Sequence, residues 1–169
     1  MPLSPDDLFA KLDSLGIRTT TVKHPPLFTV EQSKTLRGEL PGGHTKNLFL
    51  KDKKDRMWLV TAEEDRAIDL KALGTALGAS GRVSFGSPER LMRHLGVTPG
   101  AVTPFGLVND AEGQVSFVLD EGLMRHAVLN FHPLTNEATT AIARADFLRF
   151  LDAIGHAPRL LALPERAEA

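Results

Sequence analysis

Residues 42–51 read Gly42-Gly43-His44-Thr45-Lys46-Asn47-Leu48-Phe49-Leu50-Lys51, and the predicted fold is built outward from this stretch. The two glycines give the segment a flexible start. Residues 45–50 have the alternation and apolar content of a β-strand. We therefore expect a strand here that begins in a loop and ends at a charged turn.

The position of Lys46 within this strand is unusual. Side chains alternate between the two faces of a strand, so Lys46 lies on the same face as Leu48 and Leu50. Asn47 lies on the opposite face beside Phe49. If the leucine face lines the core, the Lys46 ammonium needs a hydrogen-bonded partner or serves a ligand. The alternative is a lysine at the end of a strand whose flexible stem carries the charge out to water.

The bulk composition is that of a globular protein. The chain has 169 residues, of which 42% are hydrophobic and 24% charged. We expect one domain over residues 1–169 with a sizeable core. Apolar runs fall well short of the roughly 20 residues that span a bilayer, so no membrane contact is expected. The start of the chain lacks the basic region and apolar stretch of a signal peptide, which makes a cytoplasmic location the expectation.

Cysteine is absent from the sequence, which excludes disulfides, thiolate nucleophiles and cysteine-ligated zinc. Twenty basic and 21 acidic residues give a formal net charge of −1. With so little net charge, no global field attracts the protein to nucleic acid. DNA is therefore not an expected partner, and any RNA contact must use a local basic patch.

Capping residues, turn residues and hydrophobic periodicity divide the chain into elements. They predict helices over residues 5–15, 29–37, 70–77, 88–95 and 145–154. They predict strands over residues 18–23, 45–50, 57–61, 82–85, 107–109, 114–119, 127–131, 139–142 and 159–163. We expect 107–109 and 114–119 to pair as a hairpin, 159–163 to be an edge strand, and 164–169 to be a loose tail. Because strands outnumber helices and do not alternate regularly with them, the fold class is α+β with one mixed sheet.

The common catalytic motifs are missing from the sequence. The six histidines form no close-spaced ligand pair on one helix, and no HExxH, GxSxG or GxxxxGK[ST] motif occurs. We therefore expect no metal ion and no cofactor. Three loops could present an ammonium, backbone N–H groups or an imidazole to a ligand: residues 42–47, 100–106 and 130–133. Each could equally be an ordinary hairpin start, surface turn or strand end.

Five segments of the sequence form a recognisable set. They are Lys46-Asn47-Leu48-Phe49-Leu50-Lys51-Asp52, the GxxxP turn Gly100–Pro104 followed by Phe105-Gly106-Leu107, Phe131-His132-Pro133-Leu134, His24-Pro25-Pro26 with Thr29-Val30-Glu31, and Gly155-His156-Ala157-Pro158. This set resembles the YbaK/ProX family of aminoacyl-tRNA deacylases, and within it the free-standing ProX type. The family is also similar to the editing domain inserted in bacterial prolyl-tRNA synthetases. The resemblance extends in order over nearly the whole chain.

The resemblance implies a fold and a set of site residues. The fold is a single mixed, strongly twisted β-sheet flanked by helices, in agreement with the α+β pattern. The implied catalytic residues are Lys46, Asn47 and Gly100. The implied substrate-binding residues are Ala101, Val102, Thr103, Pro104 and His132, with Val30, Leu48 and Phe49 as candidates for the pocket wall. The set includes no metal ligand.

The implied activity is that of a trans-editing hydrolase for mischarged tRNA(Pro), above all Ala-tRNA(Pro), in which a positioned water attacks the aminoacyl ester. Removal of Cys or of Ser/Thr is an alternative, as is a non-catalytic module that binds tRNA or a synthetase. The expected partners are the acceptor end of mischarged tRNA(Pro) and prolyl-tRNA synthetase. The candidate tRNA-binding residues are Lys34, Arg37, Lys51, Lys53 and Lys54, although a solvated hairpin tip would carry the same charges.

Overall fold

The structure is a mixed β-sheet with helices packed on both faces. It is a computed structural model that describes residues 2–26 and 41–166. Over these residues, eight strands join in the order β1-β7-β6-β2-β3-β5-β8, with β4 paired to β2. The strands are β1 (Thr19–Lys23), β2 (Gly43–Lys51), β3 (Met57–Glu63), β4 (Ser84–Phe85), β5 (Val115–Asp120), β6 (Val128–Phe131), β7 (Ala138–Ala143) and β8 (Arg159–Leu161). The helices are α1 (Pro5–Ser14), α3 (Leu70–Leu77), α4 (Pro88–Leu95) and α5 (Arg144–Ala153), with 3-10 turns η1 (Pro99–Ala101), η2 (Pro104–Asn109) and η3 (Glu121–Arg125).

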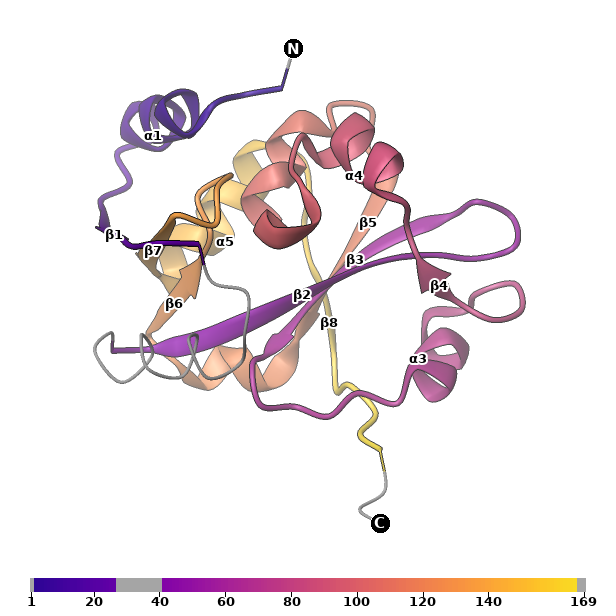
Figure 1. The fold of residues 1–169 in the computed structure, drawn as a ribbon. Helices are drawn as coiled ribbons and strands as arrows, with labels where there is room; N and C mark the ends of the chain where they lie inside the picture. The colour runs from indigo at the N-terminus through magenta and orange to yellow at the C-terminus, as the bar shows by residue number, and fades with distance from the viewer. Residues whose placement is uncertain (1, 27–40, 167–169) are drawn as a thin grey trace.

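Strand β2 joins two ladders of the sheet. Its first two residues, 43 and 44, pair in parallel with β6, and residues 45–51 pair antiparallel with β3. Its last two residues also pair with β4. Figure 1 shows β2 as the long strand that crosses the middle of the molecule between these partners. Residues 42–51 therefore contain the strand that joins the two parts of the sheet.

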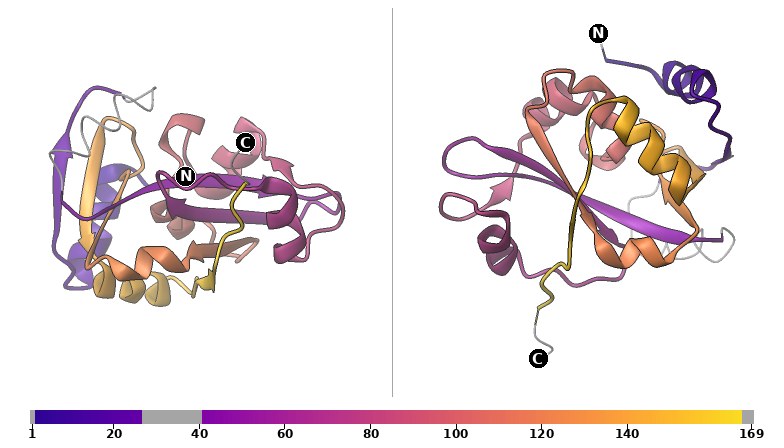
Figure 2. Two further views of the ribbon diagram at one scale, coloured as in Figure 1. Left: turned by 90° about the horizontal axis from the view of Figure 1, so that it is seen from below. Right: turned by 180° about the vertical axis from the view of Figure 1, so that it is seen from behind.

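Both faces of the sheet are packed, so the side chains of β2 are divided between two cores. Phe49 belongs to the larger core, to which α1, α4 and α5 contribute, whereas Leu48 and Leu50 pack with α3 on the other face. Figure 2 shows α5 and α3 on opposite sides of β2 and β3. The larger core contains phenylalanine rings that meet mostly edge to face, namely those of Phe105, Phe117, Phe131, Phe147 and Phe150. The prediction of a mixed sheet flanked by helices is confirmed.

The helix signals that fall on described residues are confirmed. Asp69 caps α3, because its carboxylate accepts a hydrogen bond of 3.0 Å from the N–H of Ala72. Gly78 and Gly96 end α3 and α4 with φ of 75° and 69°, in the left-handed region that favours glycine. The predicted helix over residues 29–37 lies outside the described residues.

The predicted hairpin between residues 107–109 and 114–119 is wrong. The first segment lies in the 3-10 turn η2, and β5 runs parallel to both of its neighbours, β3 and β8. The Asp110 carboxylate explains the difference, since it accepts from the N–H of Val115 at 2.8 Å and contacts Nε2 of His156 at 3.0 Å. A buried side chain thus closes the turn, and no strand is needed before it.

Residues 162–166, which follow β8, are fixed, whereas a loose tail was expected over 164–169; residues 167–169 lie outside the described residues. The N–H of Arg166 donates to the carbonyl of Ala67 at 2.8 Å, and Glu165 forms an isolated antiparallel bridge with Ile68. β8 itself lies at the edge of the sheet, as predicted. The end of the described chain is therefore tied to the loop that follows β3.

Asp52 organises the charged turn between β2 and β3. Its side chain is 1% exposed and accepts hydrogen bonds from the N–H groups of Lys54, Arg56 and Ser80 and from the Arg56 guanidinium. Burial by itself would raise the pKa of this carboxyl, but the hydrogen bonds outweigh burial and lower the pKa to about 2. The folded turn therefore requires a charged Asp52.

We predict that Asp52→Asn lowers the unfolding temperature at pH 7 by several degrees. Because the pKa of the folded state, about 2, lies below that of an unfolded aspartate, the stabilisation is present above about pH 4 and is lost as the pH falls toward 2. Wild type and variant should therefore converge at the acid end of a series of thermal melts from pH 7 to pH 2. Asp55→Asn, at the exposed tip of the same turn, is the control and should change the melting temperature little. Equal stability of wild type and Asp52→Asn at pH 7 would contradict the role of this carboxylate.

Candidate active site

Lys46 is held against the protein and does not extend freely into water. It is half-buried on β2, and its ammonium donates a hydrogen bond to the main-chain carbonyl of Arg66, in the loop after β3. Burial lowers the pKa of Lys46, and the positive charge of Arg166 acts in the same direction. The carbonyl of Arg66 is therefore the hydrogen-bond partner that a lysine on an apolar face needs.

Asn47 points to the other face of β2 and fastens a distant turn. Its Nδ2 donates to the carbonyl of Val102 at 3.1 Å, and its Oδ1 accepts from the hydroxyl of Thr61 on β3. With one partner on each side, the amide orientation is determined. The structure thus brings Asn47 and the GxxxP turn together, while the ammonium of Lys46 lies across the strand from that contact.

The GxxxP turn, residues 100–104, lies between β2 and the connection from β6 to β7. Gly100 faces this connection, because a Cβ atom at this position would lie 2.9 Å from Nδ2 of Asn136. A glycine at position 100 therefore allows a close approach of the two segments. The remaining side chains of the turn point inward: Ala101, Thr103 and Pro104 are buried and Val102 is half-buried.

His132 begins the same connection. Its Nδ1 lies 3.0 Å from the carbonyl of Ala138, which can only accept, so Nδ1 carries the proton and Nε2 of the neutral ring remains an acceptor. Burial lowers the pKa of His132, which keeps the ring neutral at pH 7. The ring of His24 lies 6.4 Å away. The negative charge of Glu64 acts to raise the pKa of both His132 and Lys46, against the effect of burial. Both groups therefore lie within electrostatic range of one carboxylate.

The candidates for the pocket wall do not lie together. Leu48 is half-buried on the face that packs with α3, whereas Phe49 is 4% exposed in the core on the opposite face. Neighbouring residues of a strand point in opposite directions, so these two side chains cannot form one wall. The prediction that both belong to it is wrong in that respect. Val30 lies outside the described residues.

The charges at the tip of the β2–β3 turn are partly neutralised. Lys51 lies 3.7 Å from the Asp55 carboxylate, which also contacts Arg90 at 3.2 Å. Lys53 and Lys54 are exposed. The other two candidates for tRNA binding, Lys34 and Arg37, lie outside the described residues.

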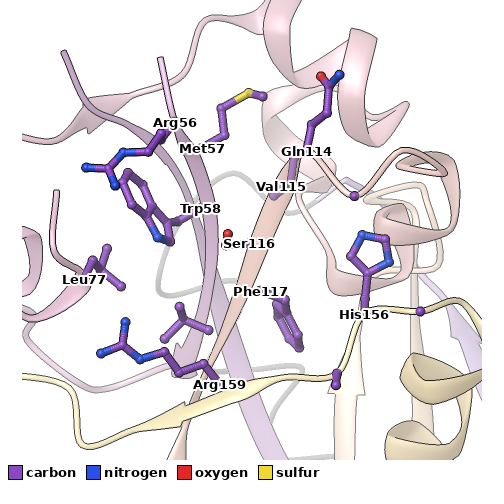
Figure 3. Close-up of a pocket in the computed structure, with 14 residues that line it drawn as sticks. Arg56, Met57, Trp58, Leu77, Gln114, Val115, Ser116, Phe117, His156 and Arg159 are labelled. Carbon is purple, nitrogen blue, oxygen red and sulfur yellow. The ribbon is translucent and has the colours of Figure 1, made fainter. Parts of the chain in front are cut away.

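A groove of about 670 Å³ lies at the start of β3 and β5 (Figure 3). Arg56 stacks 5.5 Å from the centre of the Trp58 ring on one side of it, and Arg159 donates to the carbonyl of Ala76 at 3.0 Å. None of the predicted site residues lines this groove. It is therefore separate from the candidate active site.

Within residues 2–26 and 41–166, no three or more His, Cys, Asp or Glu side chains gather in a way that could hold a metal ion. In the same ranges, no helix combines the length and apolar character needed to cross a membrane.

Sequence reasoning missed Arg66. Its carbonyl holds Lys46, and its guanidinium contacts the carboxylates of Glu63, Asp120 and Glu165. The run Glu63-Glu64-Asp65-Arg66, which begins two residues after the predicted strand 57–61, was the available signal. A run of charges is ordinarily a solvated loop, and nothing local distinguishes this one.

Comparison with known proteins identifies the family. A family model described as the aminoacyl-tRNA editing domain matches residues 24–150, which include Lys46, the GxxxP turn and His132. The chain belongs to the aminoacyl-tRNA editing domain family. The resemblance seen in the sequence is thereby confirmed.

Relatives of this editing-domain protein carry two kinds of name. The prolyl-tRNA synthetase associated domain-containing protein 1 of Mus musculus is 43% identical over 158 residues, which cover 92% of this chain and 94% of the relative. The prolyl-tRNA editing protein ProX of Acetoanaerobium sticklandii is 37% identical over 157 residues, covering 92% and 95%. A crystal structure of a proposed trans-editing enzyme for prolyl-tRNA synthetase superposes with a TM-score of 0.72 at 21% identity, covering 97% of this chain and 99% of the other. This last likeness shows a shared fold.

We predict that Asn47→Asp releases the GxxxP turn. A carboxylate cannot donate to the carbonyl of Val102 and would oppose it with like partial charge. Amide hydrogen exchange across residues 100–104 should quicken by roughly tenfold, as expected for the loss of one hydrogen bond. Mass spectrometry of deuterated peptides would measure it.

The matched control for this variant is Asn109→Asp, which removes a similar bond of 3.0 Å to the carbonyl of Leu95. Its effect should appear around Leu95 and not across residues 100–104. Unchanged exchange of the turn in Asn47→Asp would show that Asn47 does not hold it.

Proposed function

We propose that this editing-domain protein is a trans-editing deacylase that hydrolyses mischarged tRNA(Pro), with Ala-tRNA(Pro) as its preferred substrate. The observation that carries the proposal is the half-buried ammonium of Lys46, fixed by Arg66 on the strand whose next residue, Asn47, fastens the GxxxP turn. The family match supports it, as does the ProX relative, whose name is that of a prolyl-tRNA editing protein.

The chemistry suits a site without a strong nucleophile. An aminoacyl ester is already activated, so its hydrolysis depends mainly on positioning and on stabilisation of developing charge. Water attacks the carbonyl carbon, the bond to the ribose oxygen breaks, and that oxygen leaves with a proton that originates from the water. The products are the free amino acid and tRNA with its terminal hydroxyl restored. A neighbouring ribose hydroxyl of the substrate is proposed to assist.

Several of the predicted residues have a role in this proposal. The Lys46 ammonium has two N–H groups besides the one given to Arg66, and they bind a phosphate or ribose oxygen of the terminal adenosine. The N–H of Ala101 is donated to Thr98 at 2.9 Å, so the proposed donors to the ester carbonyl are those of Gly100 and Val102. Nε2 of the neutral His132 accepts a hydrogen bond from the substrate. The exposed Lys53 and Lys54 are proposed to contact tRNA phosphates, and Lys51, Lys34 and Arg37 are further candidates for such contacts.

A size argument favours alanine as the amino acid removed. A synthetase pocket built for proline cannot strongly reject a smaller side chain, because one methylene is worth only about 1–3 kcal/mol. A second and smaller pocket can admit alanine and exclude the proline ring. Esters of Cys, Ser or Thr are the alternative substrates, since the volume of this pocket decides among them.

A non-catalytic module that binds tRNA or prolyl-tRNA synthetase is the second candidate. The observation that favours it is the name of the vertebrate relatives, which refers to association with the synthetase and not to editing. Prolyl-tRNA synthetase is a proposed partner under both functions. Hydrolysis of a mischarged tRNA separates them.

We predict that the wild-type protein deacylates Ala-tRNA(Pro) and spares Pro-tRNA(Pro), and that Lys46→Ala lowers kcat/KM by about 100-fold, as loss of one positioned donor does in other hydrolases. Loss of radiolabel from tRNA(Pro) charged with Ala, Cys, Ser or Pro would measure both. Lys71→Ala removes an exposed lysine of α3 and serves as the control, with full activity expected. Deacylation by Lys46→Ala at the wild-type rate would refute the role of Lys46, and no loss from any mischarged tRNA would favour the binding module.

A further inference from the structure

The carbonyl that holds Lys46 belongs to a residue whose own side chain is fixed by three carboxylates. The Arg66 side chain is 19% exposed, and its three nitrogens contact different acids. Nε lies 2.6 Å from Asp120, Nη1 lies 2.5 Å from Glu165 and Nη2 lies 3.3 Å from Glu63. Burial alone would lower the pKa of Arg66, but these carboxylates raise it, Asp120 most of all. The guanidinium is therefore a permanent cation in one orientation.

Asp120 is the anchor of this arrangement. It is the last residue of β5 and is 1% exposed. Besides the Arg66 guanidinium, its Oδ2 accepts from the N–H of Glu63 at 3.1 Å, and its Oδ1 accepts from the N–H of Gly122 at 3.0 Å. One carboxylate thus links the end of β3, the end of β5 and the loop that carries Arg66.

Gly122 is shaped to admit the guanidinium. A Cβ atom at this position would lie 2.8 Å from Nη2 of Arg66 and 3.3 Å from Oδ1 of Asp120. A side chain here would therefore displace either the arginine or its anchor. Because Gly122 has no side chain, the planar guanidinium of Arg66 can lie against the main chain at this position.

The main chain around Arg66 is fixed on both sides. The N–H of Arg66 donates to the carbonyl of Glu63 at 3.1 Å, which closes a turn directly after β3. The next residue, Ala67, accepts from the N–H of Arg166 at 2.8 Å. With the side chain anchored as well, the carbonyl of Arg66 has one direction, and that direction is toward Lys46.

We infer that Arg66, anchored by Asp120, is a positioning residue that aims the ammonium of Lys46 at the substrate. A lysine has a long stem with many rotamers, and a single fixed acceptor selects among them. One N–H is committed to the carbonyl, which leaves two in defined directions. Misplacement of a reacting group by about 1 Å can slow an enzyme by roughly 100-fold. This inference concerns the same site and rests on the proposed deacylase function.

The kinetic test compares variants that act on different partners of one guanidinium. Arg66→Lys keeps the charge but cannot contact three acids, and Asp120→Asn keeps the shape but removes the charge of the anchor. Both should lower kcat for Ala-tRNA(Pro) by about tenfold or more while KM changes less than about twofold, because orientation and not binding is lost. Asp146→Asn removes a carboxylate that pairs with Arg149 on α5, outside the Arg66 cluster, and it is the matched control with kcat near that of the wild type.

A second measurement, by NMR, observes Lys46 in the absence of substrate. In a 15N NMR spectrum, the protons on Nζ of Lys46, whose signal is assigned by its loss in Lys46→Arg, should exchange slowly with water in the wild type and in Asp146→Asn. The signal should broaden or vanish in Arg66→Lys and in Asp120→Asn. If the wild-type protein deacylates nothing, the proposed function fails, and this NMR reading alone decides the positioning inference.

The results that would overturn the inference are distinct. Unchanged kcat with an unchanged Nζ signal in both variants would refute it, as would a loss confined to KM. If Asp120→Asn does not fold, Gly122→Ala replaces it, since that variant displaces the guanidinium while Asp120 and Arg66 are both kept. The same two readings then apply to Gly122→Ala.

Discussion

The pairing of β2 with three other strands is the constraint on which the rest of the structure depends. Because its start pairs with β6 and the remainder with β3, this strand connects two ladders into one sheet. Its side chains therefore face two different cores, and each successive residue contacts a different part of the molecule. Lys46 and Asn47 are adjacent in sequence, yet one is fixed to the loop after β3 and the other to the GxxxP turn.

The parts of the fold that could be predicted are those whose partners are close in sequence. Asp69 caps its own helix and Gly78 ends it, so both signals are complete within a few residues. The failed hairpin shows the opposite case. Asp110 closes its turn with help from His156, which is 46 residues further along the chain. No periodicity in the sequence indicates such a contact, and the segment Leu107-Val108-Asn109 therefore resembled a strand.

In the candidate site, too, local features could be predicted from the sequence and contacts between distant residues could not. Strand alternation placed Lys46 and Asn47 on opposite faces from local pattern alone. The contact between Asn47 and Val102 spans 55 residues, and the resemblance to a known family implied only that both residues belong to one site. The contact between Arg66 and Asp120 spans 54 residues and belongs to none of the quoted motifs. Arg66 lies in a charged loop after β3, and Asp120 is the last residue of β5. Neither position has a local sequence signal for this contact, so only the folded chain shows it.

The tie between Arg166 and Ala67 has a consequence for the order of events during synthesis. Ala67 leaves the ribosome roughly 5–20 s before Arg166 at a synthesis rate of about 5–20 residues per second. Through this interval β2 and β3 can already pair, but the loop beside Lys46 has no C-terminal strap. A nascent chain therefore pairs β2 with β3 before the loop that holds Lys46 is tied to the C-terminal segment, and a ribosome-bound fragment that stops short of β8 would leave that loop without this tie.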